Sequence, residues 1–243
     1  MRELEQRLKS AQSLFVLSGA GMSAESGLPT LRGVDGYWHD HRVEELASPH
    51  GFAREPLTVW RWYNQRIHAY RDARPNAGHY ALAELEALVP KMTIATQNVD
   101  SLHARAGSKE VLELHGHLRE ARCTNCGATA SLASGLAEAR IEHACGGRFR
   151  PQVVWFGEPL PQDVWARAEE AAAQADVILV VGTSAQVYPA AILALQNDRA
   201  FVAEINPGAT GLSERCDCVI RQGAAVALPA IVKALRIDGL ERY

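Results

Sequence analysis

Short apolar runs of strand length recur along this chain, and several are separated by segments with helical periodicity. The apolar runs cover residues 14–17, 92–95, 111–114, 153–156, 177–181, 201–205 and 218–220. The segments with helical periodicity include residues 79–89, 163–175 and 188–197. Runs without polar alternation are typical of strands that are buried on both faces. Strands that alternate with helices predict an α/β fold built on a doubly wound parallel sheet.

Two segments interrupt this alternation of strands and helices. Residues 36–76 are rich in Trp, Tyr, His and Arg and have helical character, and residues 121–149 hold three cysteines and several glycines. We expect both to pack together as a smaller domain beside the sheet. The predicted sheet domain then comprises residues 1–35, 77–120 and 150–243.

Composition and charge narrow the class of protein. The 243 residues are 47% hydrophobic and 22% charged, which is typical of a soluble globular protein with a full core. A net charge of -3 gives no reason to expect nucleic acid or a membrane as an obligatory partner. Residues 1–12 are charged and do not resemble a secretory signal. Five cysteines with a single C-x-x-C pair favour a metal site in a reducing compartment, and we expect the cytoplasm.

A glycine-rich turn follows the first apolar run. Gly19, Gly21 and Ala24 have the spacing G-x-G-x-x-A, which after a strand brings backbone N–H groups close to a pyrophosphate. The alternative is that the glycines only make a tight turn. Residues 27–38 contain too many glycines and prolines for a regular helix, so we expect a mobile loop over the ligand. Such a cover suggests a dinucleotide that is consumed in the reaction.

Polar residues follow four of the predicted strands, where ligands of parallel sheets bind. Asn98 and Asp100 follow the second apolar run, and they could bind a ribose and a carboxamide or cap a helix. His115 follows the third run and could act as a general base or as a structural histidine. The other strand ends carry Gly182-Thr183-Ser184 and Asn206.

These residues lie in motifs that resemble those of the sirtuins, the NAD-dependent protein-lysine deacylases. The motifs are GAGMSAESGLPT (residues 19–30), TQNVD (96–100), LHG (114–116), VVWFGE (153–158) and GTS (182–184). The resemblance extends from about residue 14 to residue 231. It implies a Rossmann-like NAD-binding domain and a small domain made of a helical module and a zinc-ribbon-like module.

The resemblance also implies where NAD and substrate bind. The implied NAD-binding residues are Gly19, Ala20, Gly21, Ser23, Glu25, Thr30, Arg32, Gln97, Asn98, Asp100, Gly182, Thr183, Ser184, Asn206 and Ala224. The acyl-lysine oxygen is expected to attack C1′ of the nicotinamide ribose, with Asn98, Asp100 and His115 as catalytic residues. His115 takes a proton from a ribose hydroxyl, and the products are lysine, nicotinamide and O-acyl-ADP-ribose. The substrate backbone is expected to pair with residues 153–158, including Val153, Phe156, Gly157 and Glu158.

The sequence departs from the sirtuin pattern at two places. Leu31 stands before Arg32 where the family usually has Phe, which puts the shielding of the reaction intermediate in question. The family's small domain carries four cysteines on zinc, and Cys123, Cys126 and Cys145 match three of them. The fourth ligand is then Glu142 or His143, since zinc accepts carboxylate and imidazole as well as thiolate. The alternative is a decayed site without metal.

One further pair concerns the acyl group that is removed. Tyr63 and Arg66 are three residues apart in a predicted helix and therefore share a face. At this place the sirtuins that remove succinyl and malonyl groups carry Tyr-x-x-Arg, together with a small Ala that Ala47 matches. The resemblance therefore implies a desuccinylase and demalonylase that keeps some deacetylase activity. Arg66 and Tyr63 would bind the acyl carboxylate.

Two other functional classes use similar residues. One is a protein ADP-ribosyltransferase with the same NAD chemistry but another acceptor, and the other is a non-catalytic NAD or ADP-ribose binding module. The presence of His115, Asn98 and Asp100 together argues against the binding module.

Overall fold

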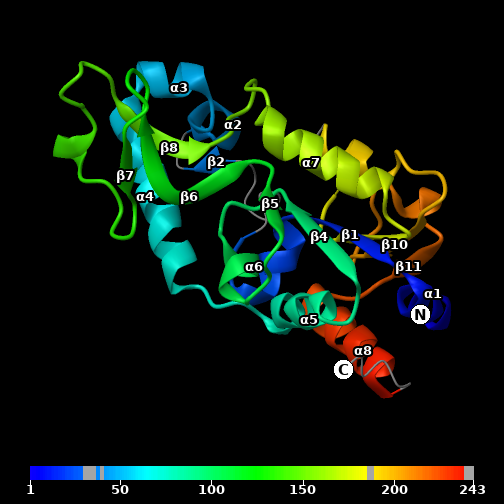
Figure 1. The fold of residues 1–243 in the computed structure, drawn as a ribbon. Coiled ribbons are helices and arrows are strands. Elements are labelled where there is room, and N and C mark those ends of the chain that lie inside the picture. Colours follow the sequence, from blue (N-terminus) through cyan, green and yellow to red (C-terminus); the bar gives the residue numbers. More distant parts are fainter. Residues whose placement is uncertain (30–36, 39–40, 185–188, 238–243) are drawn as a thin grey trace.

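A six-stranded sheet forms the centre of the larger part of the molecule (Figure 1). The computed structural model describes residues 1–29, 37–38, 41–184 and 189–237. The six strands are β1 (Ser13–Ser18), β4 (Lys91–Thr96), β5 (Val111–Glu113), β9 (Val177–Val181), β10 (Phe201–Ile205) and β11 (Cys218–Ile220). They are parallel, in the order β11-β10-β9-β1-β4-β5. This is the strand order of a doubly wound dinucleotide-binding sheet, so the predicted fold class is confirmed.

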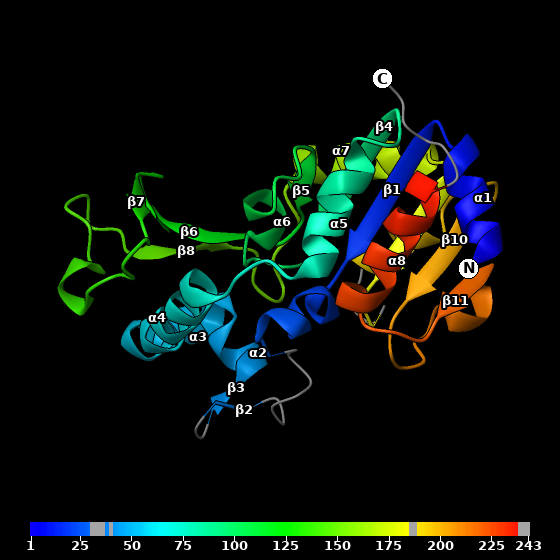
Figure 2. The same cartoon turned by 90° about the horizontal axis from the view of Figure 1, so that it is seen from below.

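Helices cover both faces of this sheet, as Figure 2 shows. Leu14 and Val16 of β1 pack on one face with α1 (Arg2–Ser10), α5 (Ala77–Glu86) and α8 (Ala224–Ile237). Phe15 and Leu17 alternate to the other face, against α7 (Gln162–Ala173) and the short η3 (Ala190–Ala194). Burial on both faces explains why the strands read as continuous apolar runs.

A smaller unit lies beside the ends of β4 and β5. Its helices are α2 (Val43–Leu46), α3 (Pro49–Arg54) and α4 (Pro56–Asp72), and its antiparallel sheet consists of β6 (Gly116–Cys123), β7 (Thr129–Ser131) and β8 (Phe149–Val153). Helix α4 packs across this sheet, and the fully buried Trp60 donates from its indole nitrogen to the Phe149 carbonyl at 2.8 Å. The remaining elements are the short segments β2 (Tyr37–Trp38), β3 (His41–Arg42), η1 (Ala20–Ser26), α6 (Leu102–Arg105), η2 (Glu138–Arg140) and η4 (Ser213–Arg215).

Some expected elements differ from those observed. The strand expected at residues 153–156 lies earlier, at Phe149–Val153, and residues 155–158 form a turn. In the described part of the helix expected at 188–197, only the 3₁₀ turn η3 is found. Strands β6 and β8 also carry the small sheet past the expected domain limits, to residues 116 and 153. The apolar run 153–156 misled because Val153 ends β8 and Trp155 is buried in the turn that follows, whereas Phe156 is exposed. Among the helices that the structure describes, none is both long and apolar enough to cross a membrane.

Candidate functional site

A cavity of about 570 Å³ lies between the central sheet and the smaller unit. It is lined by predicted residues from three groups. From the nucleotide and catalytic set come Ala20, Ser23, Gln97, Asn98, Asp100 and His115; from the acyl set Ala47, Tyr63 and Arg66; and from the substrate segment Val153, Phe156, Gly157 and Glu158. Its volume is that of a pocket for a drug-sized ligand. The fold thus brings residues from four of the five sequence motifs, together with the Tyr63 and Arg66 pair, to one space.

The glycine turn after β1 touches a second turn, which contains Gly182 and follows β9. The two turns meet between β1 and β9, where the strand order of the sheet reverses. A Cβ atom on Gly19 would lie 2.8 Å from Cβ of Thr183, and one on Gly21 would lie 2.8 Å from Cα of Gly182. The N–H groups of both glycines are already used, since they donate to the carbonyl groups of Val181 and Gly182 at 3.0 and 2.7 Å. These two N–H groups are therefore engaged within the protein in this structure, and contact of Gly19 and Gly21 with a pyrophosphate stays a prediction. The glycines are needed because two backbone turns touch.

Asn98, Ser23 and Asp100 form one hydrogen-bonded cluster below this turn. The amide of Asn98 donates to the Gly19 carbonyl at 3.0 Å and lies 3.2 Å from the Ser23 hydroxyl. The Ser23 hydroxyl donates to the Asp100 carboxylate at 2.7 Å, and the Leu102 N–H donates to the same carboxylate at 2.8 Å. Burial raises the pKa of Asp100, and these two hydrogen bonds oppose the rise. These hydrogen bonds connect the glycine turn after β1 to the residues that follow β4.

His115 lies between β5 and β6, with its ring in the cavity. Its Nδ1 lies 3.0 Å from the Gln97 carbonyl, and its own carbonyl accepts from the Val154 N–H at 2.9 Å. The next residue must be glycine, because Gly116 has a φ of +73° and a Cβ there would lie 2.3 Å from the Gln152 carbonyl oxygen. The local backbone therefore fixes His115 against both the sheet and the substrate segment.

Among the described residues, the other predicted nucleotide-binding residues do not line the cavity: Gly182, Thr183, Ser184 and Asn206 follow β9 and β10, and Glu25 and Ala224 belong to η1 and α8. Asn206 donates from its amide to the Thr183 carbonyl at 3.1 Å, next to the half-buried Ser184. The carboxylate of Glu25 accepts from the Ala225 N–H at 2.7 Å and so caps the start of α8. Ala224 is buried in the core, which leaves only its backbone for a ligand. Thr30, Leu31 and Arg32 lie outside the described residues.

The acyl end of the cavity is built by helix α4. Tyr63 and Arg66 both line it, with Ala47 opposite from the segment after α2. The Arg66 guanidinium carbon lies 4.3 Å from the centre of the Trp62 ring, and one terminal nitrogen lies 3.5 Å from the Tyr70 hydroxyl. Within the described part of the chain, Arg66 has no carboxylate partner, and its buried Nε has no hydrogen-bond partner. A half-buried cation in this state favours an anionic ligand.

The substrate segment is held by its own side chains. Glu158 accepts from Arg150 at 2.8 Å and from the Trp155 N–H at 2.8 Å. Burial alone would raise the pKa of Glu158, but these hydrogen bonds outweigh it and hold the pKa below its usual value. The Phe156 N–H donates to the Ala47 carbonyl at 2.9 Å, so this group is not open to a peptide. The Phe156 ring is 48% exposed at the mouth of the cavity.

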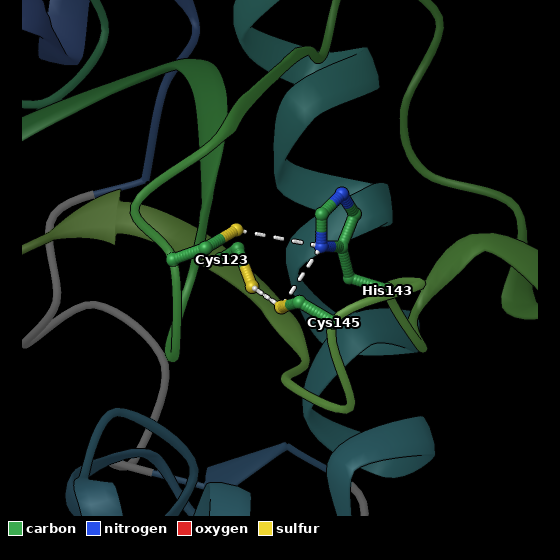
Figure 3. Close-up of side chains that lie close together, drawn as sticks. Cys123, His143 and Cys145 are labelled. Atoms are coloured by element: carbon green, nitrogen blue, oxygen red, sulfur yellow. Dashed lines mark hydrogen bonds between the residues drawn. The ribbon is translucent and has the colours of Figure 1, made fainter.

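A cluster of four metal-binding side chains lies at the far end of the small sheet. Cys123, Cys126, His143 and Cys145 place their ligand atoms within 4.8 Å of one another. Figure 3 shows the side chains of Cys123, His143 and Cys145 turned toward a common centre. The hydrogen bond from His143 is the main reason why the pKa of the Cys145 thiol falls to about 6. The alternative ligand Glu142 instead pairs with Arg148 at 2.7 Å, so the structure places His143 in the cluster.

The geometry of this cluster fits zinc. The Sγ atoms of Cys123 and Cys145 are 3.5 Å apart, and His143 Nδ1 is 3.5 Å from Cys126 Sγ and 3.1 Å from Cys145 Sγ. Zinc bonds of about 2.3 Å to sulfur and about 2.0 Å to nitrogen set tetrahedral ligand atoms roughly 3.5–3.8 Å apart. Three thiolates and one imidazole are an ordinary set for a closed structural zinc site.

Comparison with known proteins identifies the family. The Sir2 family pattern matches residues 19–189. This chain belongs to the Sir2 family. A relative named NAD-dependent protein deacylase 2, from Pyrobaculum aerophilum, is 47% identical over 232 residues, which is 94% of this chain and 93% of that protein. The resemblance to the sirtuins drawn from the sequence motifs is therefore confirmed.

Solved Sir2 structures share the same fold. A Sir2 homolog in complex with NAD superposes with a TM-score of 0.92 at 44% identity, covering 98% of this chain and 94% of the other. A mutant Sir2 homologue in complex with 2′-O-acetyl ADP ribose has a TM-score of 0.93 at 43% identity, covering 100% and 98%. These Sir2 neighbours and the metal cluster agree with the expectation of NAD and zinc as the cofactors.

Several residues of this Sir2 site were not expected from the sequence. Trp155 contacts Tyr63, Trp62 contacts Arg66, and Arg150 lies over the Trp155 ring, yet no role was assigned to these three residues from the sequence. Trp62 precedes Arg66 by four positions on one helix, a spacing that indicates a contact. Trp155 stands inside VVWFGE, where a large aromatic residue with an N–H donor was an available signal. Arg150 gave no signal in the sequence.

Proposed function

We propose that this Sir2 family chain is an NAD-dependent protein-lysine deacylase that prefers acyl groups ending in a carboxylate, succinyl and malonyl, over acetyl. The observation that carries the preference is Arg66, a half-buried cation that lines the cavity without a carboxylate partner among the described residues. The deacylase class is supported by the family and by the relative from Pyrobaculum aerophilum.

The acyl end fits a carboxylate better than a methyl group. A charge in a largely apolar pocket is costly unless it is paired, and Arg66 offers a planar fork of donors for two parallel hydrogen bonds. Tyr63 is three residues away on the same face of α4 and adds a hydroxyl. Ala47 has a short side chain, which leaves length for an acyl group longer than acetyl.

The catalytic end of the same cavity supports the deacylation chemistry. NAD, when bound, supplies the ribose carbon that the acyl oxygen attacks, and the switch point between β1 and β9 is where dinucleotides bind in such sheets. Asn98 and Asp100 would hold the nicotinamide ribose and carboxamide. His115 would take the ribose hydroxyl proton at Nε2, because Nδ1 faces the Gln97 carbonyl.

The remaining assignments follow the family resemblance. Gly182, Thr183, Ser184, Asn206 and the backbone of Ala224 would contact the adenosine half of NAD. Cys123, Cys126, Cys145 and His143 would hold one zinc ion that braces the small sheet. Residues 153–158 would contact the backbone of the acylated protein, with Phe156 at the cavity mouth.

The test is selectivity between two acyl groups on one peptide. We expect Arg66→Met to lower the ratio of kcat/KM for succinyl-peptide over acetyl-peptide by about thirtyfold to several thousandfold, since removing one partner of a buried charge pair costs roughly 2–5 kcal/mol. Tyr63→Phe should lower the ratio in the same direction, by less. The peptide mass distinguishes deacylation from ADP-ribosylation.

Arg61→Met is the matched control on the same helix. Arg61 is exposed and pairs with Glu138 at 2.8 Å, outside the cavity, so its loss should leave the ratio unchanged. Equal losses on succinyl- and acetyl-peptide in Arg66→Met would mean that Arg66 only holds α4 in place, and the carboxylate preference would have to be abandoned.

A further inference from the structure

The hydroxyl of Tyr63 already has one fixed partner. The indole nitrogen of Trp155 lies 2.9 Å from the Tyr63 hydroxyl oxygen. An indole N–H can only donate, so the Tyr63 oxygen is the acceptor and its own proton must point elsewhere. Within the residues that the structure describes, no other hydrogen-bond partner of the Tyr63 hydroxyl is found. The O–H of Tyr63 is therefore a donor without an acceptor at the wall of the cavity.

Trp155 is itself held on several sides. Its side chain is 3% exposed, and the Arg150 guanidinium carbon lies 3.5 Å from the centre of its ring. Arg150 is held in turn by Glu158 and by the Val153 carbonyl, at 2.8 and 2.9 Å. The ring of Phe52 lies 5.2 Å away, centre to centre. The indole N–H of Trp155 therefore has a defined direction. Glu158 accepts from the Trp155 backbone N–H and also holds Arg150, which lies over the Trp155 ring.

The surroundings also keep the Tyr63 proton in place. Burial raises the pKa of Tyr63 far above its usual value of 10.0, and this effect outweighs the opposing influence of Trp155 and Arg66. The phenol is thus neutral at pH 7. It can give a hydrogen bond to a ligand, while its acceptor side is occupied by Trp155.

We propose that Trp155 is a positioning residue for the acyl group: by occupying the acceptor side of the Tyr63 hydroxyl, it commits that hydroxyl to donate to a carboxylate oxygen in the cavity. This inference rests on the proposed preference for succinyl and malonyl groups. The acyl carboxylate then receives donors from two directions, the Tyr63 O–H and the Arg66 guanidinium. An acetyl methyl group has no acceptor atom for either donor.

The test is a double-mutant cycle between Trp155→Phe and Tyr63→Phe, read as the ratio of kcat/KM for succinyl- over acetyl-peptide. Trp155→Phe keeps an aromatic ring under Arg150 but removes the N–H. We expect the ratio to fall by about three- to tenfold, the effect of one neutral hydrogen bond, with the loss in KM for the succinyl-peptide. In the Tyr63→Phe background the same substitution should leave the ratio unchanged, because there is no hydroxyl left to orient.

A matched control separates this role from general loss of a buried hydrogen bond. Trp60 is fully buried on the same helix as Tyr63 and donates to the Phe149 carbonyl, away from the cavity. Trp60→Phe removes the same kind of N–H, and it should change both substrates equally. If Trp155→Phe is not folded at the assay temperature, the cycle is run with Trp155→Met, whose flexible side chain fills irregular gaps.

The outcomes distinguish this inference from the function on which it rests. The same fall in the ratio with and without the Tyr63 hydroxyl, or equal losses on both peptides, would overturn the role of Trp155. If Arg66→Met lowers the ratio while Trp155→Phe does not, the inference fails and the carboxylate preference stands. If Arg66→Met leaves the ratio unchanged, the carboxylate preference fails, and the role of Trp155 fails with it.

Discussion

The Nδ1 atom of His115 lies 3.0 Å from the backbone carbonyl oxygen of Gln97. A carbonyl oxygen only accepts, so Nδ1 carries the proton of the neutral ring and Nε2 has a free lone pair. Burial lowers the pKa of His115 below its usual 6.5, and the hydrogen bond to Gln97 only partly opposes this. The ring is therefore neutral at pH 7, which is the form that a general base requires.

We expect His115→Ala to reduce deacylation by about 10²–10⁴-fold, the usual contribution of a general base, while the protein stays folded. Because the pKa is lowered, kcat/KM of the unmodified protein should stay level above pH 6.5 and fall only below it, as the base becomes protonated. The measurement is a pH profile of kcat/KM with circular dichroism of each variant. His117→Ala, two residues along β6 and outside the cavity, serves as the control. Activity of His115→Ala close to that of the unmodified protein would remove His115 from the mechanism.

Two buried histidines, His79 and His103, link stability to pH. Their ring centres are 4.9 Å apart, and burial lowers their pKa values to about 4 and about 3, with the charge on His79 lowering that of His103 further. In the unfolded chain both titrate near 6.5, so between pH 6.5 and 4 the unfolded state binds more protons than the folded one. The free energy of unfolding is therefore complete above pH 6.5 and is lost as the pH falls, by up to about 1.4 kcal/mol per pH unit for each histidine.

Chemical unfolding across this pH range tests the linkage. We expect His79→Gln to unfold with a shallower dependence on pH between 6.5 and 4 than the unmodified chain, because one buried group no longer titrates. His50→Gln, at an exposed position on α3, should leave the dependence as it is. A pH dependence that is the same in both variants would show that His79 is not the responsible group.

The central sheet could be predicted because its strands obey a simple rule. Residues 177–181 and 201–205 are apolar at every position but one, and β9 and β10 have the same bounds. The exception is Glu204, a buried carboxylate that pairs with Arg221 at 2.9 Å. Strands buried on both faces leave a continuous apolar signal, whereas the small sheet depends on pairings between residues far apart. For this reason the limits of β6 and β8 were not visible in the sequence.

The site shows the same division between local and long-range information. Tyr63 and Arg66 share a helix face, which their spacing indicates. The contact of Trp155 with Tyr63 joins residues 92 positions apart, and no local pattern encodes it. The spacing of Gly19 and Gly21 identified the turn after β1, but it did not show that these residues must be glycine because a second turn touches them. The closest neighbours of Gly21 belong to Gly182, which the sequence alone could not place beside it.

The metal cluster predicts a stability that depends on zinc. We expect about one equivalent of zinc per chain, and we expect Cys126→Ser and His143→Ala to release it and lower the melting temperature, since structural zinc contributes folding free energy directly. The measurements are elemental analysis of protein purified without chelator and thermal unfolding with and without a chelator.

Two controls separate the ligands from their neighbours. Glu142→Gln removes the carboxylate that pairs with Arg148, and Cys216→Ser removes a thiol that lies before β11 and donates to the Leu212 carbonyl. Both should keep the metal. Zinc below about a tenth of an equivalent in the unmodified protein would favour a decayed site that is held by packing alone. Loss of zinc in Glu142→Gln but not in His143→Ala would show that the fourth ligand is Glu142 and not His143.

The contact between the two glycine turns gives the last prediction. A Cβ atom on Gly21 would lie 2.8 Å from both Cα and the carbonyl oxygen of Gly182, whose N–H is held by a hydrogen bond to the Ile205 carbonyl at 3.0 Å. Gly21→Ala should therefore destabilise the fold by about 1–3 kcal/mol, as overpacking does. Because the strain lies at the ends of β1 and β9, NAD should also bind more weakly, which calorimetry measures. Gly211→Ala, where an added Cβ has no neighbour within 4 Å, should change neither stability nor affinity. If Gly21→Ala matches Gly211→Ala in both measurements, the turns can separate at no cost and their contact does not shape the site.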